Sequence, residues 1–218
     1  MKFNIDLHCH TNQSSDSLMT ISQIIKKIEK SPLQKIAITD HNSIQAALQA
    51  VQVAPHLFII GEEIMTRQGE ILAYFVQEEI PAGLDAIEVI KELRYQNAFI
   101  SISHPFDRFR KGHWLKDDLL KIIDKIDAIE IYNARCIFEE DNTKAFQFAS
   151  QHHLLGTLGS DAHAPSELGK TYLRIADFYD RESLYAALQN AEYHRHLASP
   201  MVHFYSRYAK WKKGRKRT

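Results

Sequence analysis

Short runs of apolar residues alternate along the chain with longer segments in which apolar residues recur every three or four positions. The short runs predict β-strands, and the longer segments predict amphipathic helices. We expect strands at residues 2–8, 35–39, 57–61, 70–76, 98–103, 127–133, 154–159 and 171–177. We expect helices at residues 21–30, 43–54, 85–97, 115–126, 138–153 and 181–191, with Thr20 and Ser43 as the N-caps of the first two.

This alternation predicts an α/β fold with a mainly parallel sheet, and so many units in one domain favour a barrel. The chain has 218 residues and contains no internal repeat and no linker rich in Pro, Gly or Ser, so a single domain with a short appendage is expected. In barrels of this kind, functional side chains gather at the carboxyl ends of the strands.

The composition excludes several classes of protein. With 44% hydrophobic and 25% charged residues, the chain matches an ordinary globular protein and not a disordered one. No apolar run approaches the roughly 18 residues that a membrane helix needs, and the N-terminus is not a signal peptide. The two cysteines form no CxxC motif, which argues against a disulfide framework or a thiolate zinc site. We therefore expect a cytoplasmic protein that does not bind a membrane.

Histidines and carboxylates follow almost every predicted strand. They are His8 and His10; Asp40 and His41; Glu62 and Glu63; His104; Glu130; and Asp161 and His163, while Glu70 opens the fourth strand. Residues two apart on a strand share a face, so both members of an HxH pair can reach one point. Each motif alone is more often a turn, a cap or a pair of unrelated histidines, but their joint placement at strand ends predicts a metal site. Imidazoles and carboxylates suit zinc, manganese and iron alike.

These motifs resemble those of the PHP family, the polymerase and histidinol phosphatase family. The matching segments are DLHCHT (6–11), the acid at Asp16, TDHNS (39–43), GEE (61–63), SHPFDRF (103–109) and GSDAH (159–163), and their order holds from residue 6 to about residue 170. The resemblance implies a distorted seven-stranded β/α barrel, similar to a TIM barrel, that holds two or three divalent metal ions. It places the PHP domain at residues 1–200, followed by a basic tail at 201–218.

The resemblance also implies a ligand set for a trinuclear centre of Zn, Mn or Fe. His8, His10, Glu63 and Asp161 would hold the first metal. Glu63 would bridge to a second metal, held also by His104 and Glu70, where many members of the family have a histidine in place of Glu70. Asp16, His41 and His163 would hold the third metal. Asp40 is expected to orient a ligand.

Such a centre implies a metal-dependent phosphoesterase, in which a metal-bridging hydroxide attacks the phosphate ester of a small metabolite or nucleotide. The sequence lacks GxSxG and GxxxxGK[ST], so no competing nucleophile or P-loop is evident. Arg108, which follows His104 in the same loop as Arg110, is expected to help bind the phosphate. Arg135 is a second candidate and Lys170 a weaker one. Two alternatives stay open: a nuclease acting on short oligonucleotides, and a non-catalytic metal-binding PHP module.

The zero net charge conceals a basic tail. Residues 207–218 hold seven of the 27 Lys and Arg residues and no acid, which leaves 20 basic against 27 acidic residues in the rest of the chain, a formal charge of −7. Three interpretations remain open for this tail: a solvated terminus, a surface that binds nucleic acid, or a segment that docks on the acidic body of its own or a neighbouring subunit.

Overall fold

The computed structural model describes residues 2–215. The strands are β1 (Lys2–Asp6), β2 (Lys35–Ile38), β3 (Phe58–Met65), β4 (Glu70–Tyr74), β5 (Phe99–Ile102), β6 (Ala128–Asn133), β7 (Leu155–Gly159), β8 (Tyr172–Ala176) and β9 (Glu192–His194). The helices are α1 (Ile21–Ile28), α2 (Gln45–Val53), α3 (Ala86–Tyr95), α4 (Lys116–Ile122), α5 (Glu139–Gln151), α6 (Arg181–Leu188) and α7 (Val202–Gly214), and a 3₁₀ turn (Ile123–Lys125) follows α4.

The strands form one sheet in the order β7-β6-β5-β4-β3-β2-β1-β8-β9. Just beyond β7, the Asp161 N–H donates to the carbonyl of His8 at 2.8 Å, and the His10 N–H donates to the carbonyl of Ala162 at 2.9 Å. These bonds join the two edges of the β1–β7 set, so the sheet is a nearly closed barrel. The predicted single α/β barrel domain is confirmed, while β8 and β9 extend the sheet from β1.

The sheet is mixed, whereas the sequence pattern predicted a mainly parallel one. Four strand pairs are parallel, namely β1–β2, β2–β3, β5–β6 and β6–β7. The other four, β1–β8, β3–β4, β4–β5 and β8–β9, are antiparallel. The connection from β3 to β4 spans only residues 66–69. A link this short cannot carry a crossover, so β4 must turn back beside β3.

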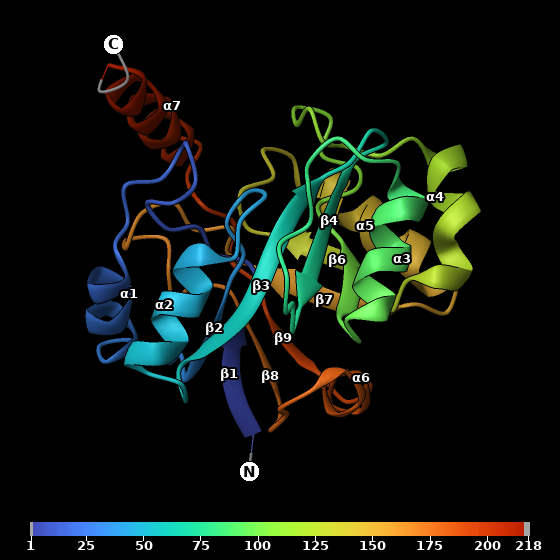
Figure 1. The fold of residues 1–218 in the computed structure, drawn as a ribbon, viewed down its shortest axis with the longest axis horizontal. Coiled ribbons are helices and arrows are strands. Elements are labelled where there is room, and N and C mark those ends of the chain that lie inside the picture. The colour runs from blue at the N-terminus through green and yellow to red at the C-terminus, as the bar shows by residue number, and fades with distance from the viewer. Residues whose placement is uncertain (1, 216–218) are drawn as a thin grey trace.

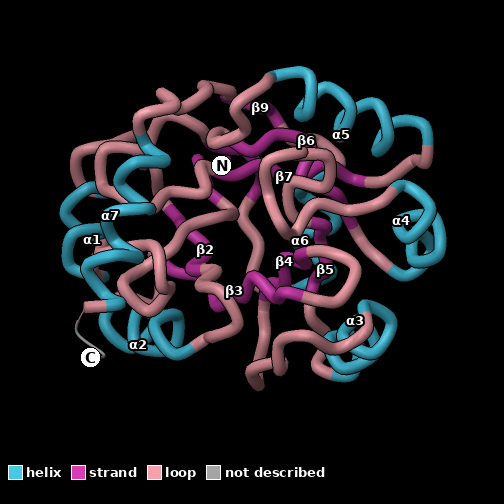
Figure 2. The backbone as a smooth tube through the Cα atoms, turned by 90° about the horizontal axis from the view of Figure 1, so that it is seen from above, coloured by secondary structure: helices cyan, strands magenta, loops and turns pink. Residues whose placement is uncertain are grey.

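Helices surround the barrel, with α1 and α2 beside β1–β3 and α3 to α5 beside the β4–β7 side (Figures 1 and 2). Alternate residues of β4 enter two different apolar clusters. Ile71 packs with residues of α3, while Leu72 packs with Ile5 of β1, which is not a neighbour of β4 in the sheet. The second cluster therefore fills the barrel interior.

Side chains cap the N-termini of α1, α3 and α6, whereas α2, α4, α5 and α7 have no side-chain cap. Thr20 caps α1 as predicted. Its side chain accepts a hydrogen bond from the Gln23 N–H, and the Gln23 side chain accepts one from the Thr20 N–H. Ser43 does not cap α2, which begins at Gln45 after Ile44 and has no side-chain cap. No helix within residues 2–215 is both long and apolar enough to cross a membrane.

Candidate metal centre

All nine predicted ligands meet at one rim of the barrel. Each has a nitrogen or oxygen within 3.5 Å of a ligand-type atom of another member, and all are buried except His41, whose side chain is 21% exposed. Segments at the ends of β1, β2, β5 and β7, together with β3, supply most of them. Glu70 opens β4 yet lies at the same rim, because β4 runs antiparallel to its neighbours.

The first group joins His8 and His10 to the carboxylates of Glu63 and Asp161. The Nε2 atoms of His8 and His10 lie 3.0 Å apart. Glu63 oxygens lie 3.3 Å from each Nε2, and an Asp161 oxygen lies 3.1 Å from that of His10. The Nδ1 of His8 lies 2.9 Å from the carboxylate of Glu130, which can only accept a hydrogen bond there. The Nε2 of neutral His8 therefore carries a lone pair that points into the group.

Ser14 determines in the same way which ring nitrogen of His10 carries the proton. Its hydroxyl donates to Asp40 at 2.5 Å and lies 3.1 Å from the Nδ1 of His10. Because that hydroxyl proton is used on Asp40, the Nδ1–H of His10 must be the donor to Ser14, and Nε2 is again left with a lone pair. Asp40 thus acts through Ser14 on His10, which agrees with its expected orienting position.

The second group contains Glu63, Glu70 and two imidazoles. The Nε2 of His104 lies 3.0 Å from Glu63 and 3.5 Å from Glu70. The Nδ1 of His41 lies 2.9 Å from Glu63 and 3.7 Å from Glu70. His41 therefore faces this group as well as the third, to which the resemblance had assigned it. The backbone of His104 has φ 23°, a left-handed conformation that is uncommon outside glycine.

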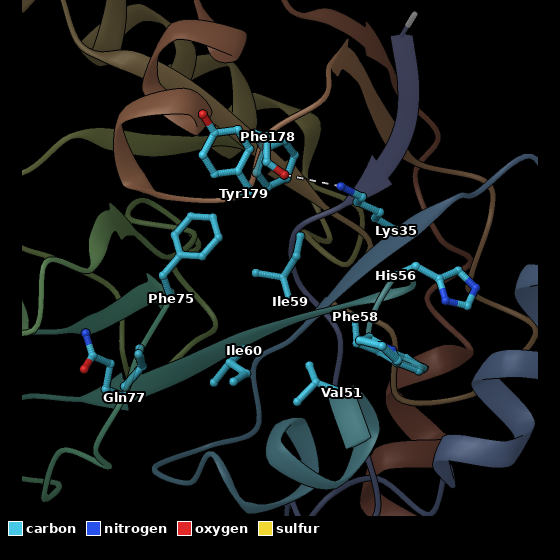
Figure 3. A pocket seen from close by; sticks show the side chains of 12 residues that line it. Lys35, Val51, His56, Phe58, Ile59, Ile60, Phe75, Gln77, Phe178 and Tyr179 are labelled. Atoms are coloured by element: carbon cyan, nitrogen blue, oxygen red, sulfur yellow. Dashed lines mark hydrogen bonds between the residues drawn. The ribbon is translucent and has the colours of Figure 1, made fainter. Parts of the chain in front are cut away.

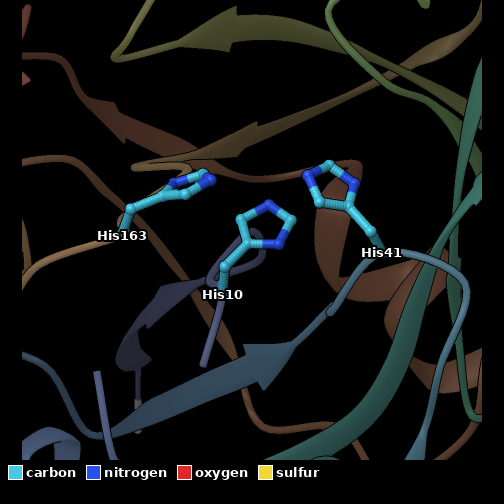
Figure 4. Close-up of side chains that lie close together, drawn as sticks. All are labelled: His10, His41 and His163. Atoms are coloured by element: carbon cyan, nitrogen blue, oxygen red, sulfur yellow. The ribbon is translucent and has the colours of Figure 1, made fainter. Parts of the chain in front are cut away.

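The third group gathers Asp16 with the imidazoles of His41, His163 and His10. Oxygens of Asp16 lie 3.5 Å from the Nε2 of His41 and 3.3 Å from the Nε2 of His163. The His10 ring lies between the other two, with centroid distances of 4.5 Å to His41 and 4.4 Å to His163 (Figure 4). His163 donates from Nδ1 to the Asp161 carbonyl at 2.7 Å, so its Nε2 also faces the group unprotonated.

The electrostatics of the rim favour the binding of cations. Burial and repulsion from Glu63 raise the pKa of Glu70. Burial alone would lower the pKa of His8, but Glu63 and Asp161 raise it well above its usual value. Single oxygens of Asp16, Glu63 and Asp161 are buried without a hydrogen-bond partner. Buried, unpartnered carboxylate oxygens beside imidazole lone pairs are the donor set of a divalent metal site, so the residues present fit the implied metals.

Arg108, the predicted phosphate contact, belongs to none of the three ligand groups. Its guanidinium pairs with Asp141 at 2.6 Å and lies over the Phe138 ring, and its side chain is 51% exposed. The arginine of this loop that reaches the ligand groups is Arg110, which is ion-paired with Asp161 and lies 3.3 Å from Asp107. The loop turns tightly after His104, where the Asp107 N–H donates to the His104 carbonyl, so the two arginines point to different sides.

The rim opens into a cavity of about 250 Å³. It is lined by Asp16, Asp107, Phe109, Arg110, Arg135, Ile137, His163, His203, Ser206, Arg207 and Lys210. A second cavity, of about 370 Å³, lies at the opposite end of the barrel, where β2 and β3 begin (Figure 3). Phe58, Phe75 and Phe178 line it, with Lys35 bonded to the Phe178 carbonyl at 3.3 Å. It contains none of the predicted ligands.

Sequence reasoning missed the supporting residues of this centre. Ser14 carries no signal of its own in the sequence, because its contact with Asp40 spans 26 positions. Glu130 was noted at a strand end without a function, and the structure pairs it with His8. Lys210, from the basic tail, lies 3.3 Å from Asp16. Residues 216–218 of that tail lie outside the described residues.

Comparison with known proteins identifies the family. A sequence model of the PHP domain matches residues 6–191, so the chain belongs to the PHP family. An uncharacterised protein of Methanocaldococcus jannaschii is 34% identical over 176 residues, which are 79% of this chain and 70% of that protein. The predicted family is therefore confirmed.

Two solved structures share the fold. One is a two-domain protein from Bacteroides vulgatus that contains a predicted PHP-like metal-dependent phosphoesterase; it has a TM-score of 0.72 and 20% identity over 89% of this chain and 65% of that chain. The other, from Bifidobacterium adolescentis, is described as a candidate metal-dependent phosphoesterase, with a TM-score of 0.64 and 17% identity over 85% of this chain and 95% of that chain. At these identities the likeness shows the fold alone.

Proposed function

We propose that this chain is a metal-dependent phosphoesterase that hydrolyses the phosphate ester of a small metabolite or nucleotide. The observation that carries the proposal is the 3.0 Å approach of the His8 and His10 Nε2 atoms. With both Nδ1 atoms donating elsewhere, a cation must lie between these nitrogens: a proton in the metal-free protein, or a metal ion. The relatives named as metal-dependent phosphoesterases support the second choice.

The ligand set follows the three groups of side chains. One metal would be held by His8, His10, Glu63 and Asp161. A second would be held by Glu63, Glu70 and His104. A third would be held by Asp16 and His163, and His41 lies between the second and the third. Mixed imidazole and carboxylate donors suit Zn, Mn or Fe. When bound, such metals act as Lewis acids that acidify water and neutralise the oxygens of a phosphate ester.

The chain's own residues supply binding and charge, and neither of its two thiols is placed to act as a nucleophile. Arg110 holds a guanidinium beside Asp161, where it can also bind a phosphate oxygen. Cys9 is packed in an apolar cluster with Met19 and Ile36. Burial raises the pKa of the Cys136 thiol, so it stays protonated at neutral pH. With both thiols inert, hydrolysis by activated water is the chemistry that the site supports.

The test is a substrate screen of the metal-loaded protein. Separate samples loaded with Zn, Mn or Fe are assayed with p-nitrophenyl phosphate, a panel of phosphorylated metabolites and nucleotides, and short oligonucleotides. His10→Ala should bind less metal and lose turnover, whereas His56→Ala, an exposed histidine remote from the rim, should behave as wild type. Turnover of oligonucleotides alone would favour a nuclease, and no turnover by fully loaded protein would favour the non-catalytic module.

A further inference from the structure

Helix α7 lies outside the segment that matches the PHP family and packs against the metal centre. The family match ends at residue 191, and α7 begins at Val202. The buried guanidinium of Arg135 donates to the carbonyl of Val202 at 3.2 Å and to Ser206 Oγ at 2.7 Å, and it also reaches the carbonyl of Asp161 at 3.4 Å. At the other end of α7, Lys213 donates to the carbonyl of Asn12 at 2.6 Å. Two separate contacts therefore fix α7 over the rim.

One face of α7 forms a wall of the cavity of about 250 Å³. His203, Ser206, Arg207 and Lys210 come from the helix, and they face Asp16 and His163 of the third ligand group together with Arg110. The cavity is smaller than most ligand pockets, which measure about 300–1,000 Å³. A compact ligand, or the terminal group of a larger one, suits this volume.

The cations that line the cavity are not equally available to a ligand. Arg110 is paired with Asp161 and Asp107, and Arg135 with Ser206 and the Val202 carbonyl. Lys210 lies 3.3 Å from Asp16. The guanidinium of Arg207 is exposed and has neither a hydrogen bond nor an ion pair within the part of the chain that the structure describes. It is therefore the charge that a ligand can engage without breaking an existing pair.

We propose that α7 forms one wall of the substrate site and that Arg207 binds the phosphate group of a compact phosphomonoester. This inference rests on the proposed function, because it takes the cavity beside the third ligand group as the entrance for substrate. A planar guanidinium pairs with two phosphate oxygens at once, which suits a terminal phosphate with its oxygens free. The basic segment then serves substrate recognition and not nucleic-acid binding.

The test compares two alanine variants of the full-length, metal-loaded protein. Arg207→Ala removes the proposed contact, and Lys212→Ala removes an exposed charge of the same helix that does not line the cavity. Binding of inorganic phosphate is measured by calorimetry, and kcat/KM is measured with p-nitrophenyl phosphate. Arg207→Ala should weaken phosphate binding about tenfold to a hundredfold, as expected for a lost charged contact, with metal content unchanged. Lys212→Ala should match wild type, and Arg207→Lys should recover part of the binding.

Three outcomes decide between the alternatives. Equal phosphate affinity in Arg207→Ala and wild type overturns the proposal. Equal loss of affinity for a short single-stranded DNA in both alanine variants, with phosphate binding intact, also overturns it and assigns α7 to nucleic acid. Loss of phosphate binding in Arg207→Ala alone supports it, even where the wild type turns over no ester, so the proposed phosphoesterase function can fail separately.

Discussion

Three imidazoles of the candidate metal centre have one ring nitrogen occupied by a neighbour that is not a predicted side-chain ligand. The Nδ1 of His8 is hydrogen-bonded to Glu130, that of His10 to Ser14, and that of His163 to the Asp161 carbonyl. Such contacts fix the tautomer and the ring orientation before any metal binds. The Nε2 atoms are therefore held facing the ligand groups, and the residues behind the rings can be tested as directly as the ligands themselves.

Ser14→Ala tests this support at a residue that touches no substrate. The substitution removes the partner of His10 Nδ1 and one of the donors to Asp40. We expect metal affinity to fall about tenfold to a hundredfold, the usual cost of losing such a contact. Fold stability should fall by about 1–3 kcal/mol, because the Nδ1–H of His10 and the N–H of His41 lose their acceptor. Metal titration against a competing chelator measures this, with Ser166→Ala, an exposed serine, as the control. Unchanged affinity would show that Ser14 does not orient His10.

Arg108 and Arg110 provide a matched pair in one loop. Arg110→Ala should lower kcat/KM on a phosphate ester by about one to two orders of magnitude, the cost of a charged phosphate contact. It should leave metal affinity equal or higher, because a cation beside Asp161 is removed. Arg108→Ala should leave both quantities near wild type, since this half-exposed side chain pairs with Asp141. Steady-state kinetics and metal analysis check both, and an equal loss of kcat/KM in the two variants would contradict the assignment.

Among the strands, the two-residue spacing predicted where most ligand side chains lie. The position of Glu70 depends instead on the direction of its strand. His8 and His10 lie beyond β1, which ends at Asp6, yet the two-residue spacing correctly predicted that both rings point to one place. Glu70 looked misplaced at the start of a strand because the sequence pattern does not report direction. The four-residue link before β4 resolves this, since it reverses the strand and brings its first residue to the rim.

The closure of the barrel depends on Gly159, the last residue of β7. A Cβ at this position would overlap the Cβ of His8, which belongs to a fixed backbone and cannot move aside as a flexible chain end can. We expect Gly159→Ala to destabilise the protein by about 1–3 kcal/mol, the usual cost of overpacking, and to displace His8. Urea denaturation measures the loss. Gly214→Ala is the control, because among residues 2–215, outside its own helix backbone, no heavy atom lies within 4 Å of its added Cβ. Equal stability of the two variants would show that β7 and β1 can separate without cost.

Across the whole fold, the position of α7 depends on contacts that the sequence does not predict. Composition revealed the basic segment, and of its three interpretations the structure supports docking on the chain's own body, through Lys210 and Lys213. The partners of these lysines, Asp16 and the carbonyl of Asn12, lie about 200 positions away in the chain. Neither periodicity nor a local motif reports such contacts, and the same holds for the divergent directions of Arg108 and Arg110 within a tight loop.

Metal binding at the candidate centre should also raise the stability of the whole domain. A metal at 100 times its dissociation constant stabilises the folded state by about 2.7 kcal/mol, which raises the Tm of a protein of this size by roughly 5–10 °C. Glu70→Gln removes one of two buried carboxylates whose repulsion raises the pKa of Glu70. The metal-free variant should therefore have a Tm equal to or above that of wild type, but a smaller gain on adding metal. Calorimetry with and without metal measures both, with the exposed Glu78→Gln as control. A full metal-induced gain in Glu70→Gln would show that Glu70 is not a ligand.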